Sequence, residues 1–116
     1  MEELKIGQKI YDMILYGYTA FRQFPKSERY TLVADIKRSM YIMLRLVISA
    51  NKKYYKKTTI QDLDIELDIL RSYVRISHDL GFLPFNKYEN LAKQLNEIGR
   101  MIGGWIKSIN KREGPY

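Results

Sequence analysis

Apolar residues recur at alternating steps of three and four along most of this chain, in four separate runs. Steps of three and four place side chains on one face of a helix, so each run predicts an amphipathic helix. In the first run the apolar positions are Leu4, Gly7, Tyr11, Ile14, Tyr18 and Phe21, widened by Ile10 and Leu15. The predicted helices span residues 2–23, 28–52, 59–80 and 85–110, and a flexible tail is expected at 111–116.

The connections between these runs contain residues that stop helices. Pro25 lacks an amide hydrogen and disfavours helical geometry at Phe24. Gly81 is expected to end the third helix and Pro84 to open the fourth. Because short connections make consecutive helices antiparallel neighbours, the 116 residues predict a single all-α domain over 1–116, an up-down-up-down four-helix bundle.

Polar residues are expected to start two of the helices. Ser27 can cap the second helix, because its hydroxyl can accept a hydrogen bond from a free amide of the first turn. Thr58 and Gln61, three residues apart, fit a capping box at the start of the third helix.

Positive charge is concentrated in the first half of the chain. Residues 1–57 hold 12 Lys and Arg against five Asp and Glu, whereas residues 58–116 hold eight against eight. Clustered positive charge favours an anionic partner such as nucleic acid, although a solvated charged face is also consistent with it. The chain has no cysteine, no signal-peptide pattern at Met1 and no apolar stretch long enough to span a membrane. We therefore expect a cytoplasmic protein that does not contact membranes.

The sequence offers little for catalysis. His78 is the only histidine, and Arg75 stands three residues before it, where a di-metal helical bundle would have a glutamate. Acidic residues at steps of two scatter around a helix, which applies to Asp62, Asp64, Glu66 and Asp68. No phosphate-binding glycine loop or nucleophile elbow is present. We predict a protein that is not an enzyme and has no metal or cofactor.

Residues 97–107 place three glycines and the only tryptophan in a stretch with helical spacing. Each glycine inside a helix costs roughly 1 kcal/mol relative to alanine. Gly99 and Gly103 are four residues apart and share one face, where a second helix can approach closely, and Gly104 and Trp105 follow them. We expect Gly99 and Gly103 to face another helix and Trp105 to be buried. Tight packing inside one bundle and a contact between subunits both fit this pattern.

The run Glu97-Ile98-Gly99-Arg100-Met101-Ile102-Gly103-Gly104-Trp105-Ile106-Lys107 resembles the C-terminal signature of the Avd family, the accessory variability determinants of diversity-generating retroelements. Further matching segments lie upstream in the same order: Phe24-Pro25-Lys26, Arg29-Tyr30-Thr31-Leu32, Leu70-Arg71, Val74-Arg75 and Tyr88-Glu89. The Phe-Pro-Lys segment also resembles four-helix-bundle proteins encoded in ribosomal RNA intervening sequences. The resemblance to Avd implies a ring-shaped homopentamer.

The segment Lys52-Lys53-Tyr54-Tyr55-Lys56-Lys57 is the densest basic tract of the chain. Aromatic rings between lysines suit single-stranded nucleic acid, because the rings stack on bases while the ammonium groups follow the phosphates. A solvated loop whose tyrosines fold back onto the bundle fits the composition equally well.

Arg71 and Arg75 lie four residues apart and therefore on one helical face. Spacing alone favours pairing within the helix, Arg71 with Asp68 and Arg75 with Asp79. The resemblance instead implies a basic surface that contacts nucleic acid and reverse transcriptase. The end of the fourth helix adds weaker candidates for that surface: Lys107, Lys111 and Arg112.

The resemblance to Avd implies a non-enzymatic accessory subunit of a diversity-generating retroelement, which agrees with the basic charge and the lack of catalytic motifs. Such a subunit would bind the reverse transcriptase and structured RNA or the RNA-DNA hybrid, and so support template-primed cDNA synthesis and mutagenic retrohoming. Two alternatives remain open on the sequence: a bundle of the ribosomal intervening-sequence type, and a structural bundle that binds no nucleic acid.

Overall fold

The computed structural model describes residues 2–113 of the chain, and the side chains of residues 5–112. The described residues form four α-helices and two short 3-10 turns, with no strand. The helices are α1 (Glu2–Ala20), α2 (Leu32–Lys52), α3 (Lys57–Asp79) and α4 (Phe85–Glu113), and the turns Phe21–Gln23 and Lys26–Glu28 connect α1 to α2. The predicted all-α four-helix bundle is confirmed.

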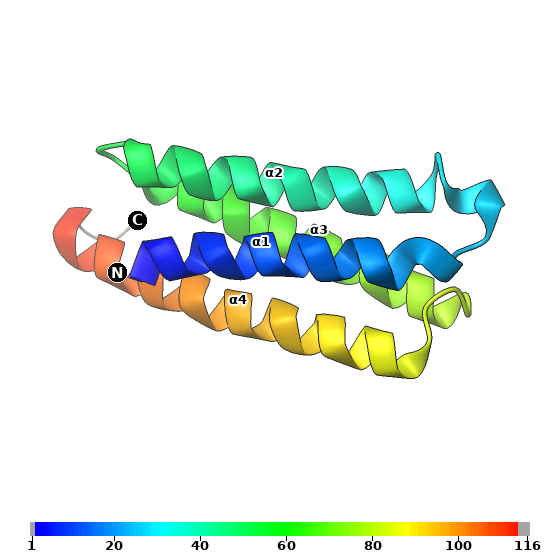
Figure 1. Cartoon of the computed structure of the whole chain (residues 1–116). Coiled ribbons are helices and arrows are strands. Elements are labelled where there is room, and N and C mark those ends of the chain that lie inside the picture. The colour runs from blue at the N-terminus through cyan, green and yellow to red at the C-terminus, as the bar shows by residue number, and fades with distance from the viewer. Residues whose placement is uncertain (1, 114–116) are drawn as a thin grey trace.

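The four helices lie side by side in an up-down-up-down arrangement (Figure 1). α2 packs against α1 and α3, and α4 packs against the same two helices, so α1 and α3 lie diagonally across the bundle. The bundle measures 46 × 24 × 22 Å. One end holds the start of α1, the α2–α3 connection and the end of α4, and the other end holds the remaining two connections (Figure 1).

The core contains one apolar stripe from each helix, but along α1 and the turn after it the buried stripe agrees with the predicted one only at Ile10, Ile14 and Phe21. Ile6, Ile10 and Met13 are fully buried, whereas Tyr11, Leu15 and Tyr18 are 51%, 56% and 41% exposed. Two stripes offset by one residue both have steps of three and four on this helix. The stripe of Ile6, Ile10 and Met13 fills the core, and the tyrosine rings lie at the surface together with Leu15.

The α1–α2 connection is longer than predicted. Phe24 is extended (φ −64°, ψ 150°), as expected for a residue before proline, and α1 therefore ends in a tight turn instead of continuing to residue 23. The prediction that Ser27 caps α2 is wrong, because Ser27 lies inside a separate 3-10 turn. α2 begins at Leu32, after the non-helical Thr31, four residues later than predicted. The Phe24 ring is held between the rings of Phe21 and Phe82, at centroid distances of 5.3 and 5.8 Å.

Helices α3 and α4 also start or end at different residues from those predicted. α3 begins at Lys57, two residues early, so Thr58 lies within the helix and the predicted capping box is absent. Gly81 ends α3 as predicted: its φ is 80°, and its amide donates to the carbonyl of His78 over 2.9 Å. α4 continues to Glu113, three residues further than predicted. Residues 114–116 of the predicted tail lie outside the described residues.

The glycine-rich part of α4 fits the prediction in part. Trp105 is buried, with 2% of its surface exposed. A Cβ added at Gly99 would lie 2.6 Å from Nη2 of Arg71 and 3.3 Å from Cδ2 of Leu67, so Gly99 faces α3 closely. The prediction for Gly103 is wrong within the chain, because an added Cβ would meet no atom within 4 Å there, nor at Gly104. Four residues turn a helix through about 40° more than one full turn, which rotates Gly103 away from α3.

We predict opposite effects of substitution at Gly99 and Gly103. Gly99→Leu should overpack the contact with α3 and lower the free energy of unfolding by about 1 to 3 kcal/mol. Gly103→Ala, the control, should raise it by up to about 1 kcal/mol because alanine favours a helix where space is free. Urea denaturation measures both. Equal effects of the two substitutions would contradict this packing.

Candidate nucleic-acid interface

The basic tract 52–57 forms the α2–α3 connection, with Lys52 closing α2 and Lys57 opening α3. Tyr54 and Tyr55 are 84% and 74% exposed, and their rings pack edge to face at a centroid distance of 4.7 Å. The alternative in which these tyrosines fold back onto the bundle is therefore wrong. The pair presents aromatic surface to solvent at the tip of the bundle.

Two lysines of the tract hold the connection in place. The Nζ of Lys56 donates to the carbonyl oxygens of Ala50 and Lys53, over 2.5 and 2.6 Å. The Nζ of Lys53 donates to the hydroxyl of Thr59 over 3.0 Å. A cation beside the last carbonyls of α2 also suits the negative end of the helix dipole. These ammonium groups thus fix the loop that displays the tyrosines.

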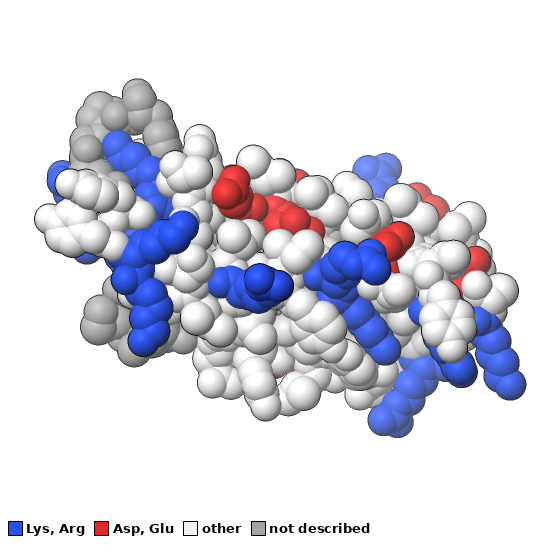
Figure 2. Space-filling view, turned by 90° about the horizontal axis from the view of Figure 1, so that it is seen from above, with Lys and Arg blue, Asp and Glu red and all other residues white. Residues whose placement is uncertain are grey.

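Arg112 joins this tract in space, although it lies 55 positions after Lys57 in the sequence. It lines a hollow of about 500 Å³ together with residues 53–56, since the end of α4 returns to the same end of the bundle. We call residues 52–57 and Arg112 the basic end. Lys and Arg side chains gather at this end of the α2 face in Figure 2. Lys107 and Lys111 are exposed on α4 but do not line the hollow.

Arg71 and Arg75 do not belong to the basic end. At 1.5 Å per residue, Arg75 lies roughly 27 Å along α3 from Lys57. The intrahelical pairs expected from spacing are both present: Arg71 Nη1 is 3.2 Å from Asp68, and Arg75 Nε is 3.9 Å from Asp79.

The two arginines differ in their surroundings. The Arg71 side chain is 40% exposed, and its Nη2 reaches across to α4, 3.4 Å from the carbonyl oxygen of Leu95. Arg75 is 78% exposed and faces solvent. Gly99 leaves the space into which the Arg71 guanidinium extends. Arg71 therefore links two helices, while Arg75 is available to a partner.

Among residues 2–113 no group of three His, Cys, Asp or Glu side chains could hold a metal ion. His78 stacks on the ring of Tyr88 at a centroid distance of 4.3 Å, and Arg100 pairs with Glu97 on the surface of α4. No helix in the described part of the chain is long and apolar enough to cross a membrane.

Most of the chain matches the model of a known family. A family model described as bAvd-like matches residues 4–109. The chain belongs to the bAvd-like family. No curated protein matches it. The matched region of this bAvd-like chain includes the basic tract, both α3 arginines and the glycine-rich segment, and it ends before Lys111 and Arg112.

A second group of cations, which the sequence analysis did not single out, surrounds a hollow at the opposite end of the bundle. Its members are Arg22, Lys26, Arg29 and Lys37. All four belong to the basic first half of the chain, and the excess of charge there was the available signal. Their spacing follows no single helical face, because a proline-containing connection brings them together.

We predict that the two α3 arginines differ in their effect on stability. Arg71→Ala should lower the free energy of unfolding by about 1 to 2 kcal/mol, because the stem and the contact with α4 are lost. Arg75→Ala should change it by less than about 0.5 kcal/mol, since its ion pair is exposed. Thermal denaturation followed by circular dichroism compares them, and equal losses would contradict the assignment of Arg71 as the linking residue.

Proposed function

We propose that this protein is a non-enzymatic accessory subunit of a diversity-generating retroelement, acting in the cytoplasm. In this role it binds structured RNA, or the RNA-DNA hybrid, together with the reverse transcriptase. Family membership supports the accessory role. The observation that carries nucleic-acid binding is the exposed pair Tyr54 and Tyr55, held among cations at the basic end.

The geometry of the basic end suits unpaired nucleotides. Two exposed rings offer faces on which bases of any sequence can stack. The surrounding ammonium and guanidinium groups neutralise phosphates and release counterions, which makes binding tight at low salt and weak at high salt. The loop is fixed by hydrogen bonds from Lys53 and Lys56, so it loses little conformational entropy when a strand binds. Binding of this kind has little sequence preference.

We predict that removing both rings weakens RNA binding. Tyr54→Ala with Tyr55→Ala should reduce affinity for a single-stranded RNA by about 1 to 3 kcal/mol for each base that no longer stacks. The matched control, Tyr54→Phe with Tyr55→Phe, keeps the rings and should bind like the wild type. Fluorescence anisotropy at several salt concentrations measures both. Undiminished binding by the alanine variant, or binding insensitive to salt, would contradict the assignment.

Self-assembly is the second part of the proposal. α3 exposes an apolar stripe of Ile65, Ile69 and Ile76, which are 58%, 38% and 44% exposed. The diagonal side of the bundle exposes Tyr11 and Leu15 on α1. Two different apolar surfaces on one chain suit a head-to-tail contact that closes into a ring.

The number five comes from the resemblance to Avd, and five copies of a chain of charge +7 carry +35. Such a ring would attract RNA strongly through its field alone. Gly103 and Gly104 leave open space on α4, where the surface of another subunit can approach.

We predict a solution mass near 69 kDa, five times the 13.8 kDa of the chain. Ile65→Glu with Ile69→Glu should lower this mass without unfolding the chain, because both side chains are exposed and charge disfavours an apolar contact. Asn86→Glu with Asn90→Glu adds the same charge at exposed positions of α4 and should leave the mass unchanged. Multi-angle light scattering decides, and a wild-type monomer at every concentration would end the proposal of a ring.

The reverse transcriptase is the proposed protein partner, with Arg75 the clearest contact residue and Lys107 and Lys111 as further candidates. A scaffold that holds polymerase and RNA together raises the effective concentration of each for the other. It therefore acts on initiation and not on the chemistry of nucleotide addition.

We predict that cDNA synthesis on the RNA of the element depends on this protein. Adding it to the reverse transcriptase should raise the yield of initiated cDNA and leave the rate of extension from an annealed primer unchanged. Arg75→Ala should lower the yield, whereas Lys93→Ala, at an exposed cation that pairs with Glu89, should not. Full yield in the absence of the protein would refute the accessory role.

A further inference from the structure

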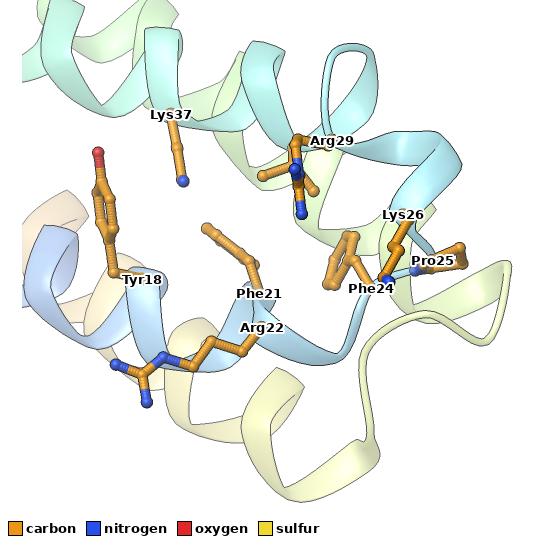
Figure 3. Close-up of a pocket in the computed structure, with 9 residues that line it drawn as sticks. Tyr18, Phe21, Arg22, Phe24, Pro25, Lys26, Arg29 and Lys37 are labelled. Atoms are coloured by element: carbon orange, nitrogen blue, oxygen red, sulfur yellow. The ribbon is translucent and has the colours of Figure 1, made fainter.

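A hollow of about 370 Å³ lies between the end of α1 and the start of α2, at the end of the bundle opposite the basic end. Buried rings of Phe21 and Phe24 form part of its wall. Figure 3 shows Lys37 and Arg29 pointing from the α2 side toward these rings, while Arg22 extends from the end of α1. We call this cavity the α1–α2 hollow.

The α1–α2 hollow is lined by cations without a carboxylate among them. Its four charged lining residues are Arg22, Lys26, Arg29 and Lys37. The neighbouring acids have other partners: Glu28 accepts from the hydroxyl of Thr31 over 2.8 Å, and Asp35 pairs with Arg38 over 2.6 Å.

No carboxylate of a described residue forms an ion pair with these four cations. Arg22, Lys26 and Arg29 are exposed, and none forms an ion pair with a described residue. The Nζ of Lys37 lies 4.1 Å from the centroid of the Tyr18 ring. Like charges around one cavity repel each other, so a bound anion relieves a cost that the fold otherwise carries.

Phosphate is the anion that these groups suit best. Guanidinium groups bind phosphate oxygens in pairs through planar N–H donors, and ammonium groups add point charges beside them. The rigid aromatic wall limits how far water can screen one side of the cavity. The walls come from two helices and the connection between them, so the cations are presented by a folded site and not by a flexible tail.

We propose that the α1–α2 hollow is a second nucleic-acid site, which holds backbone phosphates of the same single strand that stacks at the basic end. This proposal rests on the proposed function. Lys and Arg side chains lie at both ends of the face that α2 forms and also between them (Figure 2), and the bundle is 46 Å long. A strand of 24 nucleotides is about 80 Å long even at the roughly 3.4 Å per nucleotide of a stacked duplex strand, and it therefore reaches both ends. Two linked contacts then bind more tightly than either alone.

The test compares two triple variants that lose the same charge. The first removes the hollow cations through Arg22→Ala, Lys26→Ala and Arg29→Ala. The control removes Lys9, Lys93 and Arg100, exposed cations that share their surface with Asp12, Glu89 and Glu97. Binding of a labelled 24-nucleotide single-stranded RNA is measured by anisotropy across salt concentrations, and binding of inorganic tripolyphosphate by calorimetry. Melting curves check that each variant is folded.

The hollow variant should bind the RNA at least tenfold more weakly, and its slope of log affinity against log salt should fall by about two, or 0.7 for each of three lost contacts. It should also lose tripolyphosphate binding. The control should change RNA affinity less than threefold. Equal losses in the two variants would overturn the proposal by showing an effect of net charge alone.

The remaining outcomes separate the two proposals. Wild-type RNA affinity in the hollow variant, with the dependence on Tyr54 and Tyr55 intact, would overturn the second site and leave the proposed function standing. Loss of tripolyphosphate binding without loss of RNA binding would assign the hollow to a phosphate ligand other than nucleic acid and also overturn the proposal. A wild-type protein that binds no RNA would refute both.

Discussion

The burial of four apolar stripes in one core is the constraint on which the rest of this structure depends. Each helix has a single well-buried face, and with the short connections of this chain the four faces meet when consecutive helices run antiparallel. This arrangement returns the chain to the same two ends repeatedly. It brings Arg112 to a loop more than fifty residues earlier, and it gathers the cations of the α1–α2 connection at the far end. The charge pattern of the surface follows from how the core is buried.

The contact between α3 and α4 pairs an arginine of one helix with a glycine of the other. Arg71 and Gly99 belong to separate segments of the sequence that resemble Avd, and the guanidinium of Arg71 extends into the space that Gly99 leaves. The missing side chain of Gly99 therefore offsets its cost in helix propensity by admitting a polar link between helices. Arg75, one turn further along α3, has no such contact and faces solvent. Of the two arginines, Arg71 thus links α3 to α4, and Arg75 remains at the surface.

Periodicity was enough to predict four helices, whereas the glycine spacing predicted the close approach correctly at Gly99 and wrongly at Gly103. Periodicity did not distinguish between two offset stripes on α1, because Ile10 and Tyr11 both fit steps of three and four, and only packing selects the aliphatic one. The start of α2 was placed too early because Ser27 resembles a helix cap but lies in a turn that follows Pro25. The α1–α2 hollow was missed because no helical repeat links Arg22 to Arg29 and Lys37; tertiary structure alone brings them together.

The central claim is that both ends of the bundle bind nucleic acid, and that the middle of the α1–α4 side does not. Lysine-reactive footprinting with and without single-stranded RNA, read by mass spectrometry, tests it most directly. Lys52 and Lys53 should become protected when RNA is added because they belong to the basic end, and Lys26 because it lines the α1–α2 hollow. Lys9 and Lys93, beside carboxylates on the α1–α4 side, should react as before. Equal protection of all five lysines, or protection of none, would contradict the account.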